Sequence, residues 1–204
     1  NKALRNFNIS VLLMGDFWDH YKKNKDYPLI NPRTGKTERF INARTLFDLI
    51  VFQAWESAEP GVIFFDKVNE FNPFLDHLGP IVTTNPCGEV LLYPNESCNL
   101  GSINVHSFIK RNGDRKAFFD WEGLRKTVHL GVEFLDNVID VNNFPLEEIE
   151  EMTRSIRKIG LGVMGVADLL FALRLPYDGK EGLAFMENLM EFIRKPGTRG
   201  AWPC

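Results

Sequence analysis

Apolar residues recur at intervals of three and four in several stretches of the chain, which is the spacing of an amphipathic helix. The longest stretch runs from Trp121 to about Val141, with Asp120 as the predicted N-cap. Its apolar stripe predicts a buried face made of Leu124, Val128, Val132, Leu135 and Ile139. Shorter helices are predicted over residues 16–23 and 181–193. Another is predicted to begin after Asn42 as its N-cap and to end at about residue 57, and a further one to have Pro145 in its first turn.

Other apolar stretches have the patterns of strands. Phe7, Ile9 and Val11 alternate with polar residues, which predicts a half-buried strand. Residues 62–66 are continuously apolar up to their final Asp, which predicts a fully buried strand, and residues 101–105 predict a third. Asn-Pro and Thr-Gly pairs over residues 31–39 predict a connector or hairpin. Because strands alternate with helices, the sequence predicts an α/β fold.

Composition narrows the class of protein. The chain has 204 residues, 44% of them hydrophobic, enough for one domain or two small ones. Its 24 Lys and Arg and 27 Asp and Glu form no long block of one sign, so we expect no nucleic acid and no membrane surface as partner. No apolar run is long enough to cross a bilayer. Three cysteines, an odd number, argue against a secreted disulfide framework, and we expect a cytoplasmic protein.

The most informative stretch is residues 83–104, TTNPCGEVLLYPNESCNLGSIN. In extended backbone the side chains of Asn85, Cys87 and Glu89 would project to the same side, because successive side chains alternate. Pro86 and Gly88 lie between them and favour a shaped loop tip over a continuing strand. Loops that present polar groups together are frequent sites of chemistry.

These residue types allow a specific chemistry. A thiol such as that of Cys87 can cycle through thiolate, disulfide and radical states. The Glu89 carboxylate can act as a general base toward a substrate hydroxyl, and the Asn85 amide can orient that hydroxyl. Cys98 follows eleven positions later, and a hairpin would bring it near Cys87. Cys98 lies beside Leu100, so it also fits a buried, structural thiol.

Several other motifs carry weaker signals. Gly35-Lys36-Thr37 lacks the upstream Gly and the leading strand of a phosphate loop, and we reject it. Gly160, Gly162 and Gly165 form a G-x-G-x-x-G string, which we interpret as close helix packing or backbone approach to another element, because no strand precedes it. The acidic cluster at residues 147–151 predicts a solvated helix face, and we expect no metal site. Surface or structural positions are expected for the histidines of the two helices and of the 73–80 loop, namely His20, His129 and His77.

The stretch TNPCGE followed by SCNLGSIN resembles the active-site loop of the large catalytic subunit of ribonucleotide reductases. Pro before the cysteine and Gly after it resemble the adenosylcobalamin-dependent class more than the di-iron-dependent class. The resemblance continues through the segments RNFNISV, LINPRTG, EPGVIFFD, FLDNVIDVN and RKIGLGVMGVADLL and covers residues 1–193. Residues 194–204 depart from it and read as a truncation, a cloning scar or a shifted reading frame, so Cys204 inherits no family role.

The resemblance implies part of a ten-stranded α/β barrel with the cysteine loop at its centre. It implies that Cys87 forms the thiyl radical that takes the 3′ hydrogen of a ribonucleotide, with adenosylcobalamin as cofactor. Glu89 would accept the 3′-hydroxyl proton, Asn85 would bond the ribose hydroxyls, and Cys98 would be one of two reducing thiols. The substrate would be a diphosphate or a triphosphate, and the reductant a thioredoxin-like protein acting through C-terminal cysteines beyond this chain. The family also implies a homodimer at full length.

Two alternatives remain at this point. Cys87 would be the nucleophile of a conventional thiol enzyme if His77 or His106 served as its base. The chain would instead be an inactive fragment with a structural or partner-binding role. Asn1 is not a start methionine, so we expect a piece of a longer protein, and a partial barrel predicts an unstable or aggregating chain.

Overall fold

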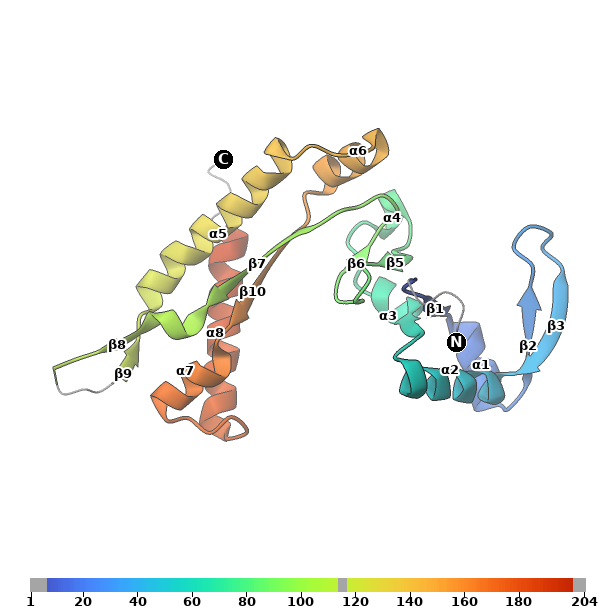
Figure 1. Ribbon diagram of the computed structural model, residues 1–204, viewed down its shortest axis with the longest axis horizontal. Coiled ribbons are helices and arrows are strands. Elements are labelled where there is room, and N and C mark those ends of the chain that lie inside the picture. Colours follow the sequence, from blue (N-terminus) through green and yellow to red (C-terminus); the bar gives the residue numbers. More distant parts are fainter. Residues whose placement is uncertain (1–6, 114–116, 200–204) are drawn as a thin grey trace. The chain divides into compact units, whose positions relative to one another are not determined.

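The computed structural model describes residues 7–113 and 117–199, and the chain divides into two compact units, residues 1–94 and 95–204. Each unit combines helices with short strands, which confirms the α/β class (Figure 1). The described strands form five separate two-stranded sheets, so they do not close a barrel. No helix among the described residues is long and apolar enough to cross a membrane.

The first unit is built on a parallel pair of strands. Strand β1 (Ser10–Leu13) pairs with β4 (Gly61–Phe64), and helix α1 (Gly15–Lys22) follows β1. An antiparallel hairpin of β2 (Asp26–Ile30) and β3 (Thr37–Asn42) confirms the turn predicted over residues 31–39. It leads into helix α2 (Ala43–Ser57). The unit ends with α3 (Phe65–Asn69), α4 (Leu75–Leu78), β5 (Thr83–Thr84) and β6 (Leu91–Leu92).

Local chemistry explains where these elements begin and pack. The Asn42 side chain accepts hydrogen bonds from the backbone N–H groups of Arg44 and Thr45, which confirms it as the N-cap of α2. Phe17 is 2% exposed and lies at the centre of a small aromatic core, with edge-on contacts to Trp18 and Tyr27. The core of this unit therefore forms where α1 packs against its neighbouring helix and strands.

The prediction of a fully buried strand at residues 62–66 was wrong in part. Strand β4 ends at Phe64, and of its residues only Ile63 is buried, while Phe64 is 48% exposed. A continuous apolar run is buried only where both faces of its sheet are covered. Among the described residues β4 pairs with β1 alone, and Gly61 and Phe64 are both exposed, so this strand is covered only in part.

The second unit is built on the parallel pair of β7 (Asn99–Asn104) and β10 (Ile159–Met164). Helix α5 (Trp121–Val141) packs on this pair, and α8 (Lys180–Arg199) packs on α5 (Figure 1). Between β7 and α5 lie the short helix η1 (Val105–Phe108) and the antiparallel strands β8 (Ile109–Arg111) and β9 (Ala117–Phe119). Helices α6 (Glu147–Ile156) and α7 (Val166–Leu173) flank β10.

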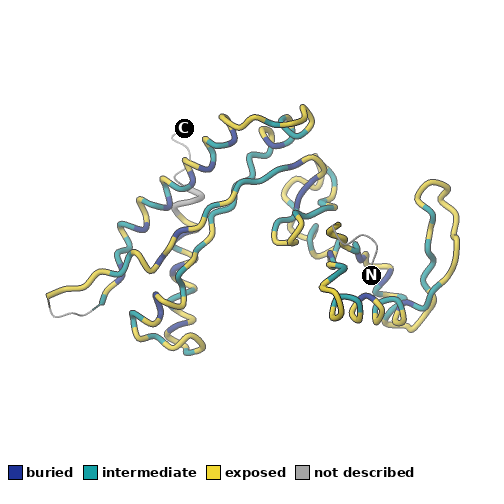
Figure 2. Tube along the Cα trace, viewed as in Figure 1, coloured by how far each residue is buried: buried dark blue, intermediate teal, exposed yellow. Residues whose placement is uncertain are grey.

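Helix α5 follows the sequence prediction closely. The Asp120 side chain accepts from the backbone N–H of Gly123, and the buried residues of α5 are the five predicted for its apolar stripe. Figure 2 shows these buried positions recurring along one side of α5. Leu124 is fully buried in a core cluster with residues of η1, β9, α7 and α8, so α5 is the central helix of this unit.

Two glycines of the string lie in a strand, and the third, Gly165, is the N-cap of helix α7. Gly160 and Gly162 lie in β10, paired with Leu100 and Ser102 of β7. A Cβ at Gly160 would meet the end of the Leu100 side chain, which would have to move, and Leu100 is 56% exposed. The prediction of backbone approach to another element is confirmed by the pairing of β10 with β7, and helix α5 packs on this pair.

Three further predictions concern the ends of helices. Helix α6 begins at Glu147, so Pro145 precedes the helix and does not lie in its first turn. Arg157 follows α6 and pairs with Asp136 and Asp140 of α5, and its guanidinium lowers the pKa of Asp140. Helix α8 continues to Arg199, past the helix end predicted at residue 193. Cys204 lies outside the described residues.

We expect Leu124→Ala to destabilise the second unit by about 2–5 kcal/mol, because it removes buried methyl groups and leaves a cavity. Leu130→Ala in the same helix is the matched control, since Leu130 is 66% exposed. Hydrogen exchange of α5 peptides in a complete enzyme measures both effects, as faster exchange for the first variant only. Equal exchange in the two variants would contradict the predicted core.

Candidate active site

Residues 83–92 form an antiparallel hairpin, here called the cysteine hairpin, in which Thr83 pairs with Leu92 and Thr84 with Leu91. At its tip the Asn85 N–H donates to the Val90 carbonyl at 3.2 Å, and the Gly88 N–H donates to the Asn85 carbonyl at 3.0 Å. Gly88 has φ +80°, which favours glycine at this position. The predicted loop tip is confirmed.

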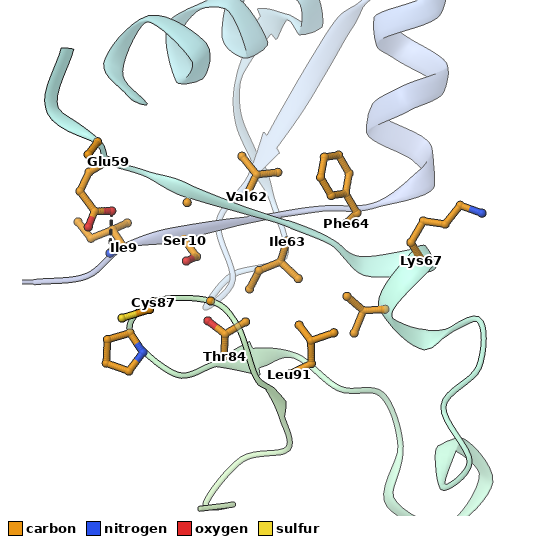
Figure 3. A pocket seen from close by; sticks show the side chains of 15 residues that line it. Ile9, Ser10, Glu59, Val62, Ile63, Phe64, Lys67, Thr84, Cys87 and Leu91 are labelled. Carbon is orange, nitrogen blue, oxygen red and sulfur yellow. Dashed lines mark hydrogen bonds between the residues drawn. The ribbon is translucent and has the colours of Figure 1, made fainter. Parts of the chain in front are cut away.

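Cys87 is exposed at this tip and lines a cavity of about 640 Å³, here called the cysteine cavity. Figure 3 shows Ser10 and Ile63 from strands β1 and β4 on one side of the cavity, and Thr84 and Leu91 from the hairpin on the other. Small-molecule sites commonly occupy about 300–1,000 Å³, so the volume suits a nucleotide-sized ligand. The exposed thiol thus lies where a ligand can reach it.

The structure distributes the three predicted polar residues unevenly. Asn85 lines an adjoining cavity of about 430 Å³, which shares Ser10 and Thr84 with the cysteine cavity. Glu89 is exposed and is not among the described residues that line either cavity. The prediction that spacing alone puts all three on one face is not confirmed, because alternation requires extended backbone and the turn at Gly88 interrupts it.

The Asn85 side chain also has a local structural role. Its Oδ1 accepts a hydrogen bond from the Val90 N–H at 3.0 Å, which closes the tip of the hairpin. Any donation to a ligand would therefore come from its Nδ2, the atom that carries the two amide hydrogens.

Charged and polar groups that the sequence did not single out also line the cysteine cavity. Glu59 accepts from the Ile9 N–H at 3.4 Å and holds β1 near the start of β4. Lys67 forms an ion pair with Glu70 at 2.8 Å, and the hydrogen bond from Lys67 to Glu70 raises the pKa of its ammonium. Ser10 lines both cavities. No motif marks these residues in the sequence, because each is a single polar residue in a different segment of the chain.

Cys98 lies in the second unit, just before β7, and is half-buried. It lines a smaller cavity of about 160 Å³ that also contains Thr153 and Lys158. The Ser97 and Thr153 hydroxyls are 2.8 Å apart, and the Lys158 ammonium lies 2.8 Å from the fully buried carboxylate of Glu96. This polar, accessible setting differs from the fully buried, apolar one considered for Cys98.

Cys87 and Cys98 are both thiols, and they belong to different units. Of the candidate bases, His77 is exposed in α4 and His106 is exposed in η1, within the second unit. The described residues that line the cysteine cavity include no histidine. None of the residues that the structure places around this cavity can therefore serve Cys87 as a histidine base.

Fold and site together define an α/β domain with a cysteine-bearing hairpin at a ligand-sized cavity. The family model for the barrel domain of ribonucleotide reductase matches residues 1–199. The chain belongs to the ribonucleotide reductase barrel family. The matched residues extend past Ile193. That the reductase-like part of the chain ends at residue 193 therefore stays a prediction.

Relatives with curated names agree with this family. The chain is 49% identical over 193 residues to the vitamin B12-dependent ribonucleoside-diphosphate reductase of Thermoplasma acidophilum, covering 95% of this chain and 24% of that protein. It is 42% identical over 209 aligned positions to the enzyme of the same name from Mycobacterium tuberculosis, covering 98% and 29%. A ribonucleoside-diphosphate reductase subunit alpha from Chlamydia pneumoniae is 34% identical over 157 residues, covering 75% and 14%. The chain thus spans about a quarter of the length of the first two relatives.

Proposed function

We propose that this chain forms part of the catalytic barrel of an adenosylcobalamin-dependent ribonucleotide reductase, which converts ribonucleotides to 2′-deoxyribonucleotides. The observation that carries the proposal is the exposed Cys87 of an Asn-Pro-Cys-Gly-Glu hairpin beside a nucleotide-sized cavity. The names of the relatives in Thermoplasma acidophilum and Mycobacterium tuberculosis support the class of reaction and the cofactor. In a complete barrel of ten strands, the pairs β1–β4 and β7–β10 would be parts of one sheet.

Each site residue has a distinct task in the proposed reaction. Cys87, as a sulfur radical, takes the hydrogen atom from C3′ of the ribose, so an S–H bond forms as the C3′–H bond breaks. Glu89 accepts the proton of the 3′-hydroxyl, and Asn85 donates to a ribose hydroxyl through Nδ2. The 2′-hydroxyl leaves as water with a proton from one of two thiols. These two thiols give up two protons and two electrons in all, so that C2′ gains a hydrogen and the sulfurs form a disulfide; Cys98 is one thiol, and the second lies beyond this chain. Cys87 then returns its hydrogen atom to C3′ and is a radical again.

Adenosylcobalamin, when bound, supplies the homolytic chemistry that oxidises the Cys87 thiol to a radical. The described residues are compatible with such a group, because the Cys87 thiol is exposed and can be reached from outside the cysteine cavity. Gly88 beside it has no side chain to block that approach. The cavity walls include apolar Ile63 and Leu91, which help to exclude water from a reactive radical.

The proposal extends to the partners of the complete protein. Its substrate is a ribonucleoside diphosphate or triphosphate, and its reductant is a thioredoxin-like protein acting on cysteines beyond this chain. Two copies of the complete protein form a homodimer. A conventional thiol enzyme is the weaker candidate, because no histidine lines the cysteine cavity among the described residues.

The test uses a chimeric enzyme in which this chain replaces the matching 193-residue segment of the Thermoplasma acidophilum relative. We expect it to form deoxyribonucleotide under anaerobic conditions from a ribonucleotide, adenosylcobalamin and a dithiol. Product is measured by chromatography. A chimeric enzyme that binds ribonucleotide but forms no product would contradict the proposal, and the unmodified relative is the positive control.

Reaction with iodoacetamide distinguishes a conventional thiol enzyme from the proposed reductase. A nucleophile with a paired base is alkylated without cofactor at a rate that rises near neutral pH and is lost in Cys87→Ala. We expect no such dependence near neutral pH for the chimeric enzyme. Its appearance would favour the conventional thiol enzyme.

A further inference from the structure

Two asparagine side chains near the cysteine cavity have unusually complete hydrogen bonding. Asn69, the last residue of α3, donates from Nδ2 to the Phe65 carbonyl at 3.0 Å and to the Ile81 carbonyl at 3.1 Å. Its Oδ1 accepts from the Ile81 N–H at 2.8 Å and from Nδ2 of Asn72 at 3.1 Å. One side chain thus holds both backbone groups of Ile81.

Asn72 continues the same cluster. Its Nδ2 donates to the Gly79 carbonyl at 3.3 Å as well as to Asn69. Its Oδ1 accepts from the Phe74 N–H at 3.0 Å and from the hydroxyl of Tyr93. Tyr93 is 2% exposed, so its hydroxyl reaches Asn72 from within the unit. We call Asn69, Asn72 and Tyr93 the asparagine–tyrosine cluster.

The chemistry of this cluster requires asparagine at both positions. An amide offers two donor hydrogens and one oxygen with two acceptor sites, and both side chains use this whole capacity. Aspartate has almost the same shape but accepts only, so it would place a carboxylate oxygen against a backbone carbonyl. The cluster therefore has one well-defined arrangement, which is the property needed to fix a position.

The cluster lies at the two ends of the cysteine hairpin. Ile81 comes two residues before β5, and Tyr93 directly follows β6, so the incoming and outgoing chains are held by the same pair of amides. The amides themselves are placed by α3, which directly follows β4. Strand β4 supplies Ile63 to the wall of the cysteine cavity that faces the hairpin (Figure 3).

We propose that Asn69, Asn72 and Tyr93 are positioning residues for Cys87. They fix the hairpin relative to strand β4 and so set the distance between the thiol and a ligand in the cysteine cavity. The inference rests on the proposed function, since that distance matters most for transfer of a hydrogen atom from C3′. Such a transfer is steeply sensitive to the separation of the reacting atoms, because reaction starts from a near-contact geometry.

The variants are chosen to remove hydrogen bonds without removing volume. Tyr93→Phe keeps the buried ring and loses the hydroxyl, and Asn72→Asp keeps the shape and loses both donors. Tyr177→Phe and Asn188→Asp are matched controls at exposed positions in the second unit, Asn188 lying on α8. All four are made in the chimeric enzyme, and circular dichroism verifies the fold of each.

The first readout does not need activity. We expect hydrogen exchange of the peptide containing residues 83–92 to rise about tenfold or more in Asn72→Asp, and to stay unchanged in both controls. Unchanged exchange of this peptide in both cluster variants would overturn the proposal. If the chimeric enzyme forms no deoxyribonucleotide but this exchange rises as expected, the proposed function fails while the positioning of the hairpin is upheld.

The second readout separates positioning from loss of folded protein. We expect Tyr93→Phe to lower kcat about tenfold, with KM changed less than about twofold. We also expect a larger kinetic isotope effect on kcat with a 3′-deuterated ribonucleotide, because hydrogen transfer becomes the slow step. A smaller folded fraction would lower kcat without changing the isotope effect. A fall in kcat with an unchanged isotope effect, or an unchanged kcat, would therefore overturn the proposal.

Discussion

We expect replacement of Cys87 by alanine in the chimeric enzyme to lower the rate of deoxyribonucleotide formation by about 10³-fold or more. Loss of an essential catalytic group typically lowers the rate of an enzyme by this much. The thiol is the group that would remove hydrogen from C3′, and no other described residue lining the cysteine cavity carries a thiol. Because the Cys87 side chain is exposed, its truncation leaves the packing of the hairpin intact. Product analysis gives the loss of rate, and ribonucleotide binding by calorimetry stays within about threefold.

Cys98→Ser is the informative comparison for this result. It removes a reducing thiol and keeps Cys87, so the enzyme loses net reduction while hydrogen removal at C3′ continues. We expect slow exchange of a 3′-tritium label into water for Cys98→Ser, and none for Cys87→Ala. Equal label release by the two variants would contradict the different roles proposed for the two cysteines.

The chain on its own is expected to aggregate and to show no reversible, cooperative thermal transition. Large apolar side chains are exposed in both units, with Trp55 80%, Phe71 86% and Phe171 87% exposed. Two-stranded sheets are marginal in water, and the described strands form no larger sheet. Such surfaces and strand edges promote association between chains.

Light scattering and differential scanning calorimetry of the 204-residue chain test this expectation. The chimeric enzyme is the control, because a complete barrel would pair the strand edges that the isolated chain leaves open. A monodisperse monomer that melts reversibly in a single transition would contradict the prediction. That result would also favour the view that the chain is a folded module with a structural or partner-binding role.

Local signals were sufficient for much of the fold. The Asp120 cap and the stripe of α5 needed no tertiary information, because helical spacing dictates which side chains share a face. Asn42 capped α2 as expected, and the turn residues at 31–39 marked the β2–β3 hairpin. The sequence did not reveal the strand nature of the Gly160 region, since the two glycines of β10 hide the pattern that a strand normally shows.

The candidate site also has features that the sequence predicted and features that it did not. Cys87 and the loop tip at Gly88 were predicted from residue types and turn chemistry, which act over a few residues. The cavity beside the thiol was not predicted, because Ser10, Ile63 and Leu91 come from elements up to eighty residues apart in the chain. Nor did any pattern indicate that Asn69 and Asn72 hold the hairpin through Ile81 and Tyr93.

The sequence by itself determined the α/β class, the boundaries of α2 and α5, the cysteine loop and the resemblance to the reductase family. These follow from periodicity, capping and a motif, all of which are local. Only the tertiary structure decided which faces are covered, which strands pair, and that Cys87 and Asn85 open onto adjoining cavities while Glu89 lies outside both. The physical reason is that burial and hydrogen-bond partners depend on chain segments that are distant in sequence, and their positions are fixed by packing.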